Sequence, residues 1–248
     1  MTLGIISQAR TTSTRLPGKV LLHAGGRTML DHHLDRLTRL NPNHPVYIAT
    51  TTNDTDDPIV DLAHARGIEI FRGSEEDVLS RFMGCAEAFG LDAVVRVTSD
   101  CPLIDPALVA QGIEWFLAAN DPWTYVSNAL TRTFPRGMDY EVFSVQALRQ
   151  AHEHAIEPYQ REHVTPYLYE RRDPRTTLVP LTRTPDKSSY RLTLDTQDDF
   201  TLLKTLIEDH NAATLDTDAI ITILDANPHL AAINHHIEQK KLEVDSAH

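Results

Sequence analysis

The N-terminal stretch constrains the fold most, because a short apolar run leads directly into a polar, cation-bearing loop. Leu3, Ile5 and Ile6 form a run of strand type, and residues 8–19 follow it with the sequence QARTTSTRLPGK. An apolar strand so close to the N-terminus is best placed at the centre of a sheet. The chain is therefore predicted to organise itself around this strand and the loop that leaves it.

The loop is suited to bind a polyphosphate. Arg10, Arg15 and Lys19 supply three cations whose spacing excludes a single helix face. Small residues, among them Ala9 and Ser13, let backbone N–H groups approach a ligand, and a phosphate chain is bound by such amides together with charged donors. The loop matches neither a Walker A motif nor a GxGxxG fingerprint. Spacing alone leaves a solvated basic loop as an equal alternative.

Length and charge narrow the class of protein. A chain of 248 residues can form one large α/β domain, which we divide into a nucleotide-binding part (1–120), an acceptor-side part (121–195) and C-terminal helices (196–248). The net charge of −12 argues against nucleic acid or an acidic membrane as a partner. No stretch approaches the roughly 18 apolar residues of a membrane span, so we expect a cytoplasmic protein.

Cysteine and histidine usage predicts no metal cluster of the zinc type. Cys85 and Cys101 are too few and too far apart for a disulfide framework or a CxxC site. Thirteen histidines are present, but none joins a cysteine or a second histidine at a convincing ligand spacing. We therefore expect two reduced thiols and reject a zinc site.

The first half of the chain alternates strand and helix patterns. This alternation predicts an α/β fold with a doubly wound, mostly parallel sheet. Asp57 and Asp105, each followed by proline, are predicted as helix N-caps. The expected strands after the first are 46–49, 68–71 and 93–97, and the expected helices begin near 29, 57, 74 and 106.

From residue 123 the pattern becomes richer in short strands, and we expect a small antiparallel insertion over the acceptor side of the crevice. Helices dominate again after residue 197, and Asn227-Pro228 separates the last two. Leu230, Ile233 and Ile237 at the end are packing residues or contacts of a possible homodimer. The expected strands are 123–127, 138–143, 176–180 and 190–194, and the expected helices are 144–154, 198–208, 216–225 and 228–238.

Two aspartates are candidates for binding Mg²⁺. Asp100 directly follows the strand 93–97, and ligands of open α/β sheets lie beyond the carboxyl ends of strands. Mg²⁺ takes one or two protein carboxylates and leaves its other positions to water or phosphate. Asp195 also lies between a predicted strand and a predicted helix, although from the residues alone an N-cap is the better interpretation for it.

Four separated motifs carry a resemblance that covers nearly the whole chain. They are QARTTSTRLPGK at 8–19, RGMDYEVF at 136–143, REHVTPY at 161–167 and LDTQDDF at 194–200. Together they resemble the cytidylyltransferase family, which includes the CMP-Kdo and CMP-acylneuraminate synthetases and, more closely, the proteins called spore coat polysaccharide biosynthesis protein F. The resemblance implies a fold of the nucleotide-diphospho-sugar transferase (GT-A-like) type. Gln197 stands where the family usually has proline, which leaves the preceding acid in place.

The resemblance also implies roles for individual residues. It supports Asp100 and Asp195 as the Mg²⁺ ligands, with Arg10 and Lys19 beside them as catalytic residues. The nucleotide-binding residues would be Gln8, Ala9, Arg10, Ser13, Arg15, Lys19, Arg72, Ser74 and Ser99. The acceptor-binding residues would be Arg136, Asp139, Glu141, Glu162 and His163, with Asp139 and Glu141 on one face of a strand and His163 a possible base.

We thus expect a Mg²⁺-dependent nucleotidyltransferase that uses an NTP, with CTP favoured. It would transfer CMP to a sugar acid, sugar derivative or phosphorylated small molecule and release pyrophosphate. One alternative is a nucleotide-sugar-dependent glycosyltransferase, although Asp100 is followed by Cys101 and Pro102 and not by the second acid of an Asp-x-Asp motif. Another alternative is a nucleotide-binding module without turnover.

Overall fold

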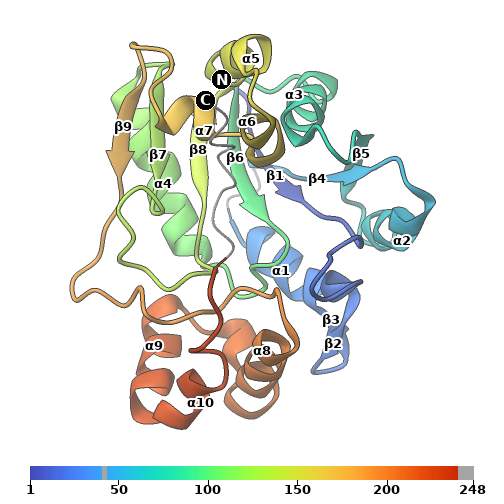
Figure 1. The fold of residues 1–248 in the computed structure, drawn as a ribbon, viewed down its shortest axis with the longest axis vertical. Coiled ribbons are helices and arrows are strands. Elements are labelled where there is room, and N and C mark those ends of the chain that lie inside the picture. Colours follow the sequence, from blue (N-terminus) through green and yellow to red (C-terminus); the bar gives the residue numbers. More distant parts are fainter. Residues whose placement is uncertain (41–43, 240–248) are drawn as a thin grey trace, which may run out of the picture.

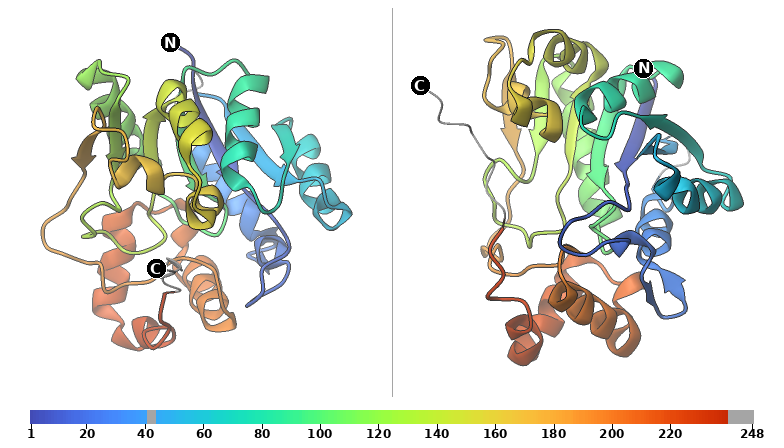
Figure 2. Two further views of the ribbon diagram at one scale, coloured as in Figure 1. Left: turned by 45° about the horizontal axis from the view of Figure 1, so that its top comes forward. Right: turned by 45° about the vertical axis from the view of Figure 1, so that its right-hand side comes forward.

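The fold is known from a computed structural model that describes residues 1–40 and 44–239 (Figures 1 and 2). Its strands are β1 Leu3–Gln8, β2 His23–Ala24, β3 Arg27–Thr28, β4 Val46–Thr51, β5 Glu69–Gly73, β6 Ala93–Thr98, β7 Thr124–Ser127, β8 Glu141–Ser144 and β9 Thr177–Pro180. Its α-helices are α1 Met29–Leu37, α2 Asp57–Ala65, α3 Val78–Ala88, α4 Pro106–Ala119, α5 Val145–His154, α6 Pro158–His163, α7 Pro166–Tyr169, α8 Gln197–His210, α9 Thr217–Ala226 and α10 Pro228–Ala232. Short 3₁₀ turns lie at Lys19–Leu21, Asp54–Asp56 and Ala212–Thr214.

Strand β1 lies near the middle of a seven-stranded sheet, as its apolar sequence predicts. The strand order is β5-β4-β1-β6-β8-β7-β9, and β2 and β3 form a separate two-stranded ribbon. β1 runs parallel to β4 on one side and to β6 on the other. β8 is antiparallel to both β6 and β7, so the short strands of the middle third extend the main sheet. The predicted α/β class and mostly parallel sheet are confirmed.

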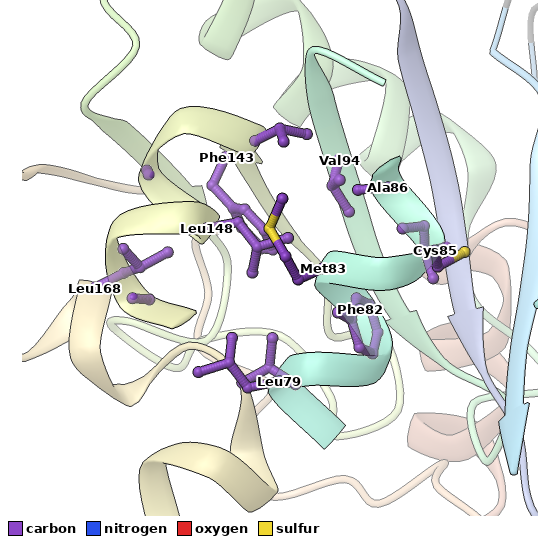
Figure 3. Packing of buried hydrophobic residues seen from close by; sticks show 14 of the residues in the cluster. Leu79, Phe82, Met83, Cys85, Ala86, Val94, Phe143, Leu148 and Leu168 are labelled. Carbon is purple, nitrogen blue, oxygen red and sulfur yellow. The ribbon is translucent and has the colours of Figure 1, made fainter. Parts of the chain in front are cut away.

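Helices cover both faces of this sheet. On one face α3 and α5–α7 bury a cluster in which Phe82 and Met83 of α3 meet Phe143 of β8 and Leu148 of α5 (Figure 3). On the other face α1 and α4 cover β1, β6 and β8, and α2 packs with α1 against Ile48 of β4. Because both faces are buried, the central strands are apolar in nearly every position, which explains the strong signal of the run 3–6.

The C-terminal helices α8–α10 form a group of their own beyond the sheet (Figure 1). An apolar cluster joins them to α1 through Met29. Arg36 of α1, which is 1% exposed, donates hydrogen bonds to the carbonyl oxygens of Ile104 (2.5 Å), Ala213 (3.0 Å) and Leu215 (2.6 Å). This buried guanidinium binds the turn between α8 and α9 to the rest of the molecule, because each carbonyl would otherwise be buried without a partner.

Several local predictions are confirmed and others are wrong. Asp105 caps α4, as predicted, by accepting from the backbone N–H of Ala107 at 2.9 Å. Asp57 is not a cap, because α2 begins at Asp57 itself and Asp56 precedes it. The helix predicted at 228–238 ends at Ala232. The predicted strand 190–194 does not form, since its hydrogen bonds go to two separate segments, at Arg136 and at Asp100.

Three further expectations concern membrane-spanning helices, the two cysteines and the apolar residues near the C-terminus. In the ranges 1–40 and 44–239, no helix is both long enough and apolar enough to cross a membrane. Cys85 and Cys101 are buried and free, as expected. Leu230 and Ile233 pack into the C-terminal cluster, which supports the packing interpretation for them, whereas the homodimer stays a prediction.

His33 of α1 links the core to the sheet and makes stability depend on pH. It is fully buried, and burial lowers its pKa to about 4 although a hydrogen bond to the Cys101 carbonyl, at 2.9 Å, opposes that shift. That carbonyl can only accept, so Nδ1 carries the proton and Nε2 faces the Ser7 hydroxyl at 2.9 Å. The folded protein therefore holds His33 neutral at pH values where the unfolded chain protonates it.

We predict that acid destabilises the protein through this residue. Below an unfolded pKa near 6.5 the unfolded state binds the proton first, so stability falls as pH drops from 6.5 towards 4. Between pH 7 and pH 5 the His33 contribution amounts to about 2 kcal/mol. Urea unfolding at the two pH values should show this loss, and His33→Gln should remove that part of it. An equal pH dependence in the variant would contradict the assignment.

Candidate functional site

A cavity of about 390 Å³ opens beyond the carboxyl ends of β1 and β6. The N-terminal loop forms one wall, the residues after β6 form the floor, and α6 forms the opposite wall. The residues that line it are Gln8, Ala9, Arg10, Ser13, Thr14, Arg15, Lys19, Val20, Thr98, Ser99, Asp100, Pro158, Tyr159, Glu162, His163, Asp195 and Gln239. The predicted crevice is therefore present, and the loops at 8–19 and 98–100 face it together.

The shape of the N-terminal loop depends on Asp56, a residue that sequence reasoning missed. Its fully buried carboxylate accepts from the Thr11 N–H and hydroxyl, both at 2.7 Å, and from the hydroxyls of Thr50 and Thr51. Burial opposes ionisation of Asp56, but these hydrogen bonds prevail and lower its pKa. Five donors, among them the Thr51 N–H at 3.3 Å, converge on this carboxylate, and the sequence signal was the acid-rich turn that follows β4.

Lys19 connects the two candidate metal ligands. Its Nζ lies 3.0 Å from Asp100 Oδ2 and 2.8 Å from Asp195 Oδ1, so both carboxylates share one cation. Burial lowers the pKa of Lys19, but the two acids more than offset this and raise it. Burial likewise raises the pKa of Asp100, and the ammonium group beside it brings the pKa well below its usual range. Lys19 and Asp100 are therefore both charged at neutral pH.

Asp195 has further cations on its other oxygen. Arg15 and Arg191 both reach Asp195 Oδ2 at 2.9 Å, and Arg191 also donates to Asp199 Oδ1 at 2.8 Å. The N-cap of α8 is Thr196, which forms a capping box with Asp199. The carboxylate of Asp195 is thus not used as a cap, and the interpretation that its sequence position favoured is wrong.

Backbone contacts fix where Asp195 lies relative to Asp100. Leu194 donates its N–H to the Asp100 carbonyl at 2.7 Å, and Leu192 donates to the Arg136 carbonyl at 2.6 Å. Gly137 makes this close approach possible, since its φ is +101° and an added Cβ would lie 2.4 Å from the Leu192 carbonyl carbon. A residue with a side chain would push the segment that carries Asp195 away.

The cluster has the donor set that a small divalent cation takes. Hard cations such as Mg²⁺ bind through carboxylate oxygens, with only one or two supplied by the protein. Asp100 and Asp195 each turn one oxygen towards the same positive centre, here the Lys19 ammonium. The Lys19 ammonium lies within 3.0 Å of both carboxylates, at a position where a divalent cation would have both as ligands. The residues therefore fit a divalent ion.

The other predicted nucleotide-binding residues divide into two groups. Seven of the nine line the cavity, namely Gln8, Ala9, Arg10, Ser13, Arg15, Lys19 and Ser99. Arg72 and Ser74 do not: Arg72 Nε donates to the Thr51 carbonyl at 2.8 Å and its Nη1 pairs with Asp57, while Ser74 Oγ accepts from the Asp77 N–H. Arg10 lies 3.7 Å from Glu75, which brings the segment after β5 close to the loop.

The predicted acceptor-binding residues also separate. Glu162 and His163 line the cavity from α6, whereas Arg136, Asp139 and Glu141 do not. Asp139 precedes β8 and pairs with Arg132 at 2.6 Å, so it shares no strand face with Glu141, and that prediction is wrong. The chain leaves the ladder before Glu141 because Asn128 takes the backbone groups of Met138 and Tyr140. Tyr159 and Gln239 also line the cavity, and sequence reasoning missed both.

The fold is α/β, and an ion cluster of Lys19, Asp100 and Asp195 lies beyond the central strands of its sheet. A family model described as Cytidylyltransferase matches residues 4–225. The chain belongs to the cytidylyltransferase family.

Individual relatives agree with this family. An uncharacterized protein, MJ1063, of Methanocaldococcus jannaschii is 40% identical over 241 residues, which are 96% of each chain. The spore coat polysaccharide biosynthesis protein SpsF of Bacillus subtilis is 34% identical over 235 residues, covering 91% of this chain and 95% of SpsF. A solved cytidylyltransferase from Leptospira borgpetersenii superposes with a TM-score of 0.89 at 33% identity, covering 97% of this chain and all of that one. The predicted resemblance is confirmed.

Proposed function

We propose that the protein is a CTP-dependent cytidylyltransferase that transfers CMP to a sugar acid or a related sugar derivative and releases pyrophosphate. The observation that carries the proposal is the ion cluster of Lys19, Asp100 and Asp195 on the floor of the cavity, in a chain of the cytidylyltransferase family. The similarity to SpsF supports a product used in polysaccharide synthesis.

The reaction we infer is attack of an acceptor oxygen on the α-phosphorus of CTP. A new P–O bond forms to the acceptor, and the bond between the α- and β-phosphates breaks, so that pyrophosphate leaves with the electron pair. An acceptor carboxylate or phosphate oxygen needs no base. A hydroxyl would lose its proton, and His163, one of the predicted acceptor residues that line the cavity from α6, would take it as a base.

The loop cations would bind the leaving pyrophosphate. In the structure Arg15 and Lys19 pair with Asp195 and Asp100, and Arg10 lies near Glu75. A triphosphate offers oxygens that can replace these carboxylates as partners, and Arg can bind two such oxygens at once. Binding of the nucleotide then changes partners within a cluster that is already organised, which limits the reorganisation that the reaction itself requires.

We further propose that Asp100 and Asp195 hold Mg²⁺. The ion would neutralise charge on the α-phosphate and polarise it for attack. Lys19 shares the same carboxylate oxygens, so the ammonium and the cation compete for them unless the triphosphate draws Lys19 away. Binding of the nucleotide would therefore strengthen binding of the metal, and binding of the metal would strengthen binding of the nucleotide.

The proposal predicts pyrophosphate release from one nucleotide. With Mg²⁺ and a pool of sugar acids, sugar phosphates and phosphorylated small molecules, CTP should give release well above GTP, UTP and ATP. Asp100→Asn should lower turnover by roughly two orders of magnitude or more, because the charge of a metal ligand is lost at the reacting phosphate. CTP binding without release from any acceptor would favour a module without turnover, and an unaffected Asp100→Asn variant would remove that residue from the mechanism.

A second prediction concerns the competition at the carboxylates. Lys19→Met removes the ammonium but keeps the apolar stem, so without nucleotide the variant should bind Mn²⁺ about tenfold more tightly than the wild type, a gain of about 1.4 kcal/mol. Calorimetric titration with Mn²⁺ alone measures this.

Lys204→Met is the matched control, because Lys204 is exposed and pairs with Glu208 on α8. It should leave Mn²⁺ binding unchanged. Weaker or unaltered Mn²⁺ binding by Lys19→Met would show that the Lys19 ammonium does not compete with the metal for its carboxylate ligands.

A further inference from the structure

The wall of the cavity opposite the N-terminal loop ends in a strained turn. Val164, the residue after α6, has φ 71° and ψ −55°, and the Thr165 N–H donates to the His163 carbonyl at 2.8 Å. These values define a γ-turn with positive φ, a rare conformation that is most unfavourable for a β-branched residue. Val164 is fully buried, so its surroundings must impose the conformation. The strain lies directly beside Glu162 and His163, which line the cavity.

Thr165, which follows the turn, makes an unusual contact. It is the N-cap of α7, where a threonine hydroxyl normally accepts from a backbone N–H of the new helix. Here the hydroxyl makes no such cap and donates instead to Glu141 Oε1 at 2.8 Å. The side chain therefore gives up its usual local partner for a carboxylate that is 24 residues earlier in the chain.

Glu141 is held by several buried groups. Its Oε2 pairs with Arg96 of β6 at 2.6 Å, and its Oε1 also accepts from the Tyr125 hydroxyl at 2.8 Å. Arg96 in turn lies 3.4 Å from the side-chain oxygen of Gln8, a residue of the cavity wall. One carboxylate thus connects the central sheet, the nucleotide side of the cavity and the turn that follows α6.

The other side of α6 is fixed independently. Arg161 donates from Nε to Asp77, the N-cap of α3, at 3.1 Å, and from Nη1 to the His152 carbonyl at 2.8 Å. α6 has only six residues, and these contacts, the Tyr159–Glu170 hydrogen bond at 2.9 Å and the Thr165–Glu141 hydrogen bond all act on it or on the turn that follows it. The side chains left to face the cavity are those of Pro158, Tyr159, Glu162 and His163.

We propose that Glu141 is a positioning residue, which holds the turn at Val164 through Thr165 and so presents Glu162 and His163 to the acceptor. The proposal rests on the function proposed above, because it names the acceptor as a substrate. The Thr165–Glu141 contact itself does not depend on that function. Glu141 does not line the cavity, and its side chain contacts Thr165, Arg96 and Tyr125. Its role is therefore different from the acceptor binding that its sequence motif implies.

The first test removes one hydrogen bond and leaves the Glu141–Arg96 pair intact. Thr165→Val is nearly isosteric and deletes only the donated hydroxyl. Amide hydrogen exchange of the segment 158–169 should accelerate by about tenfold, the equivalent of one buried hydrogen bond to a charged group. This readout needs neither nucleotide nor acceptor, so it stands even if the pyrophosphate assay finds no substrate.

Matched controls separate positioning from general loosening. Thr176→Val alters another buried threonine whose hydroxyl has no hydrogen-bond partner in the described residues, and it should leave exchange in 158–169 unchanged. Tyr125→Phe removes a different donor to the same Glu141 oxygen and should affect the segment less than Thr165→Val. Glu141→Gln, if it folds, should add little to the effect of Thr165→Val on exchange in 158–169, since Thr165 is the contact that joins Glu141 to this segment.

Kinetics with the acceptor identified by the pyrophosphate assay completes the test. Thr165→Val should raise the acceptor KM or lower kcat, together by about tenfold in kcat/KM, because misplaced binding groups lose productive geometry. The Kd for CTP should stay within about twofold of the wild type. Unchanged exchange in 158–169 would overturn the proposal, because it would show that the Thr165–Glu141 hydrogen bond does not hold the turn. A loss of CTP affinity equal to the loss in acceptor kcat/KM would also overturn it, because it would show general disruption of the site.

Discussion

The sharing of one ammonium group by two carboxylates is the interaction on which the rest of the site depends. Lys19, Asp100 and Asp195 come from distant parts of the chain: Lys19 begins a 3₁₀ turn after the N-terminal loop, Asp100 follows β6 and Asp195 precedes α8. Like charges on Asp100 and Asp195 could not lie so close together in a partly buried floor without a cation between them. The doubly wound sheet, the close approach at Gly137 and the C-terminal helices all serve to bring these three groups together.

This cluster also indicates how an acidic protein would bind the highly charged anion that we propose as its substrate. The net charge is −12, yet the loop cations are gathered at one cavity, where each has a carboxylate partner. In the proposed reaction, a triphosphate with its metal ion would replace these partners on both sides, phosphate for the cations and metal for Asp100 and Asp195. The local arrangement of charge, not the overall charge, would then decide what this surface binds. Helix α6 also lines the cavity, where we propose that the acceptor binds.

Much of the fold could be predicted because local patterns and global topology agree. The strand–loop–helix opening, Asp105 as a cap and the alternation up to residue 119 follow from short-range rules. Where prediction failed, the cause differs from case to case. Residues 190–194 form no strand because their hydrogen bonds go to Arg136 and Asp100, which are distant in sequence, whereas Asp195 is not a cap because the neighbouring Thr196 takes that position. The link from Glu141 to Thr165 has no sequence signal at all, since only tertiary folding brings the two together.

The most direct test of the central claim is a crystal structure of the protein with CTP and Mg²⁺. The account predicts that the α-phosphate lies beside Asp100 and Asp195, that the metal contacts both carboxylates, and that Lys19 has left them for the β- and γ-phosphates. A triphosphate bound elsewhere, with Lys19 still paired to both aspartates, would contradict it.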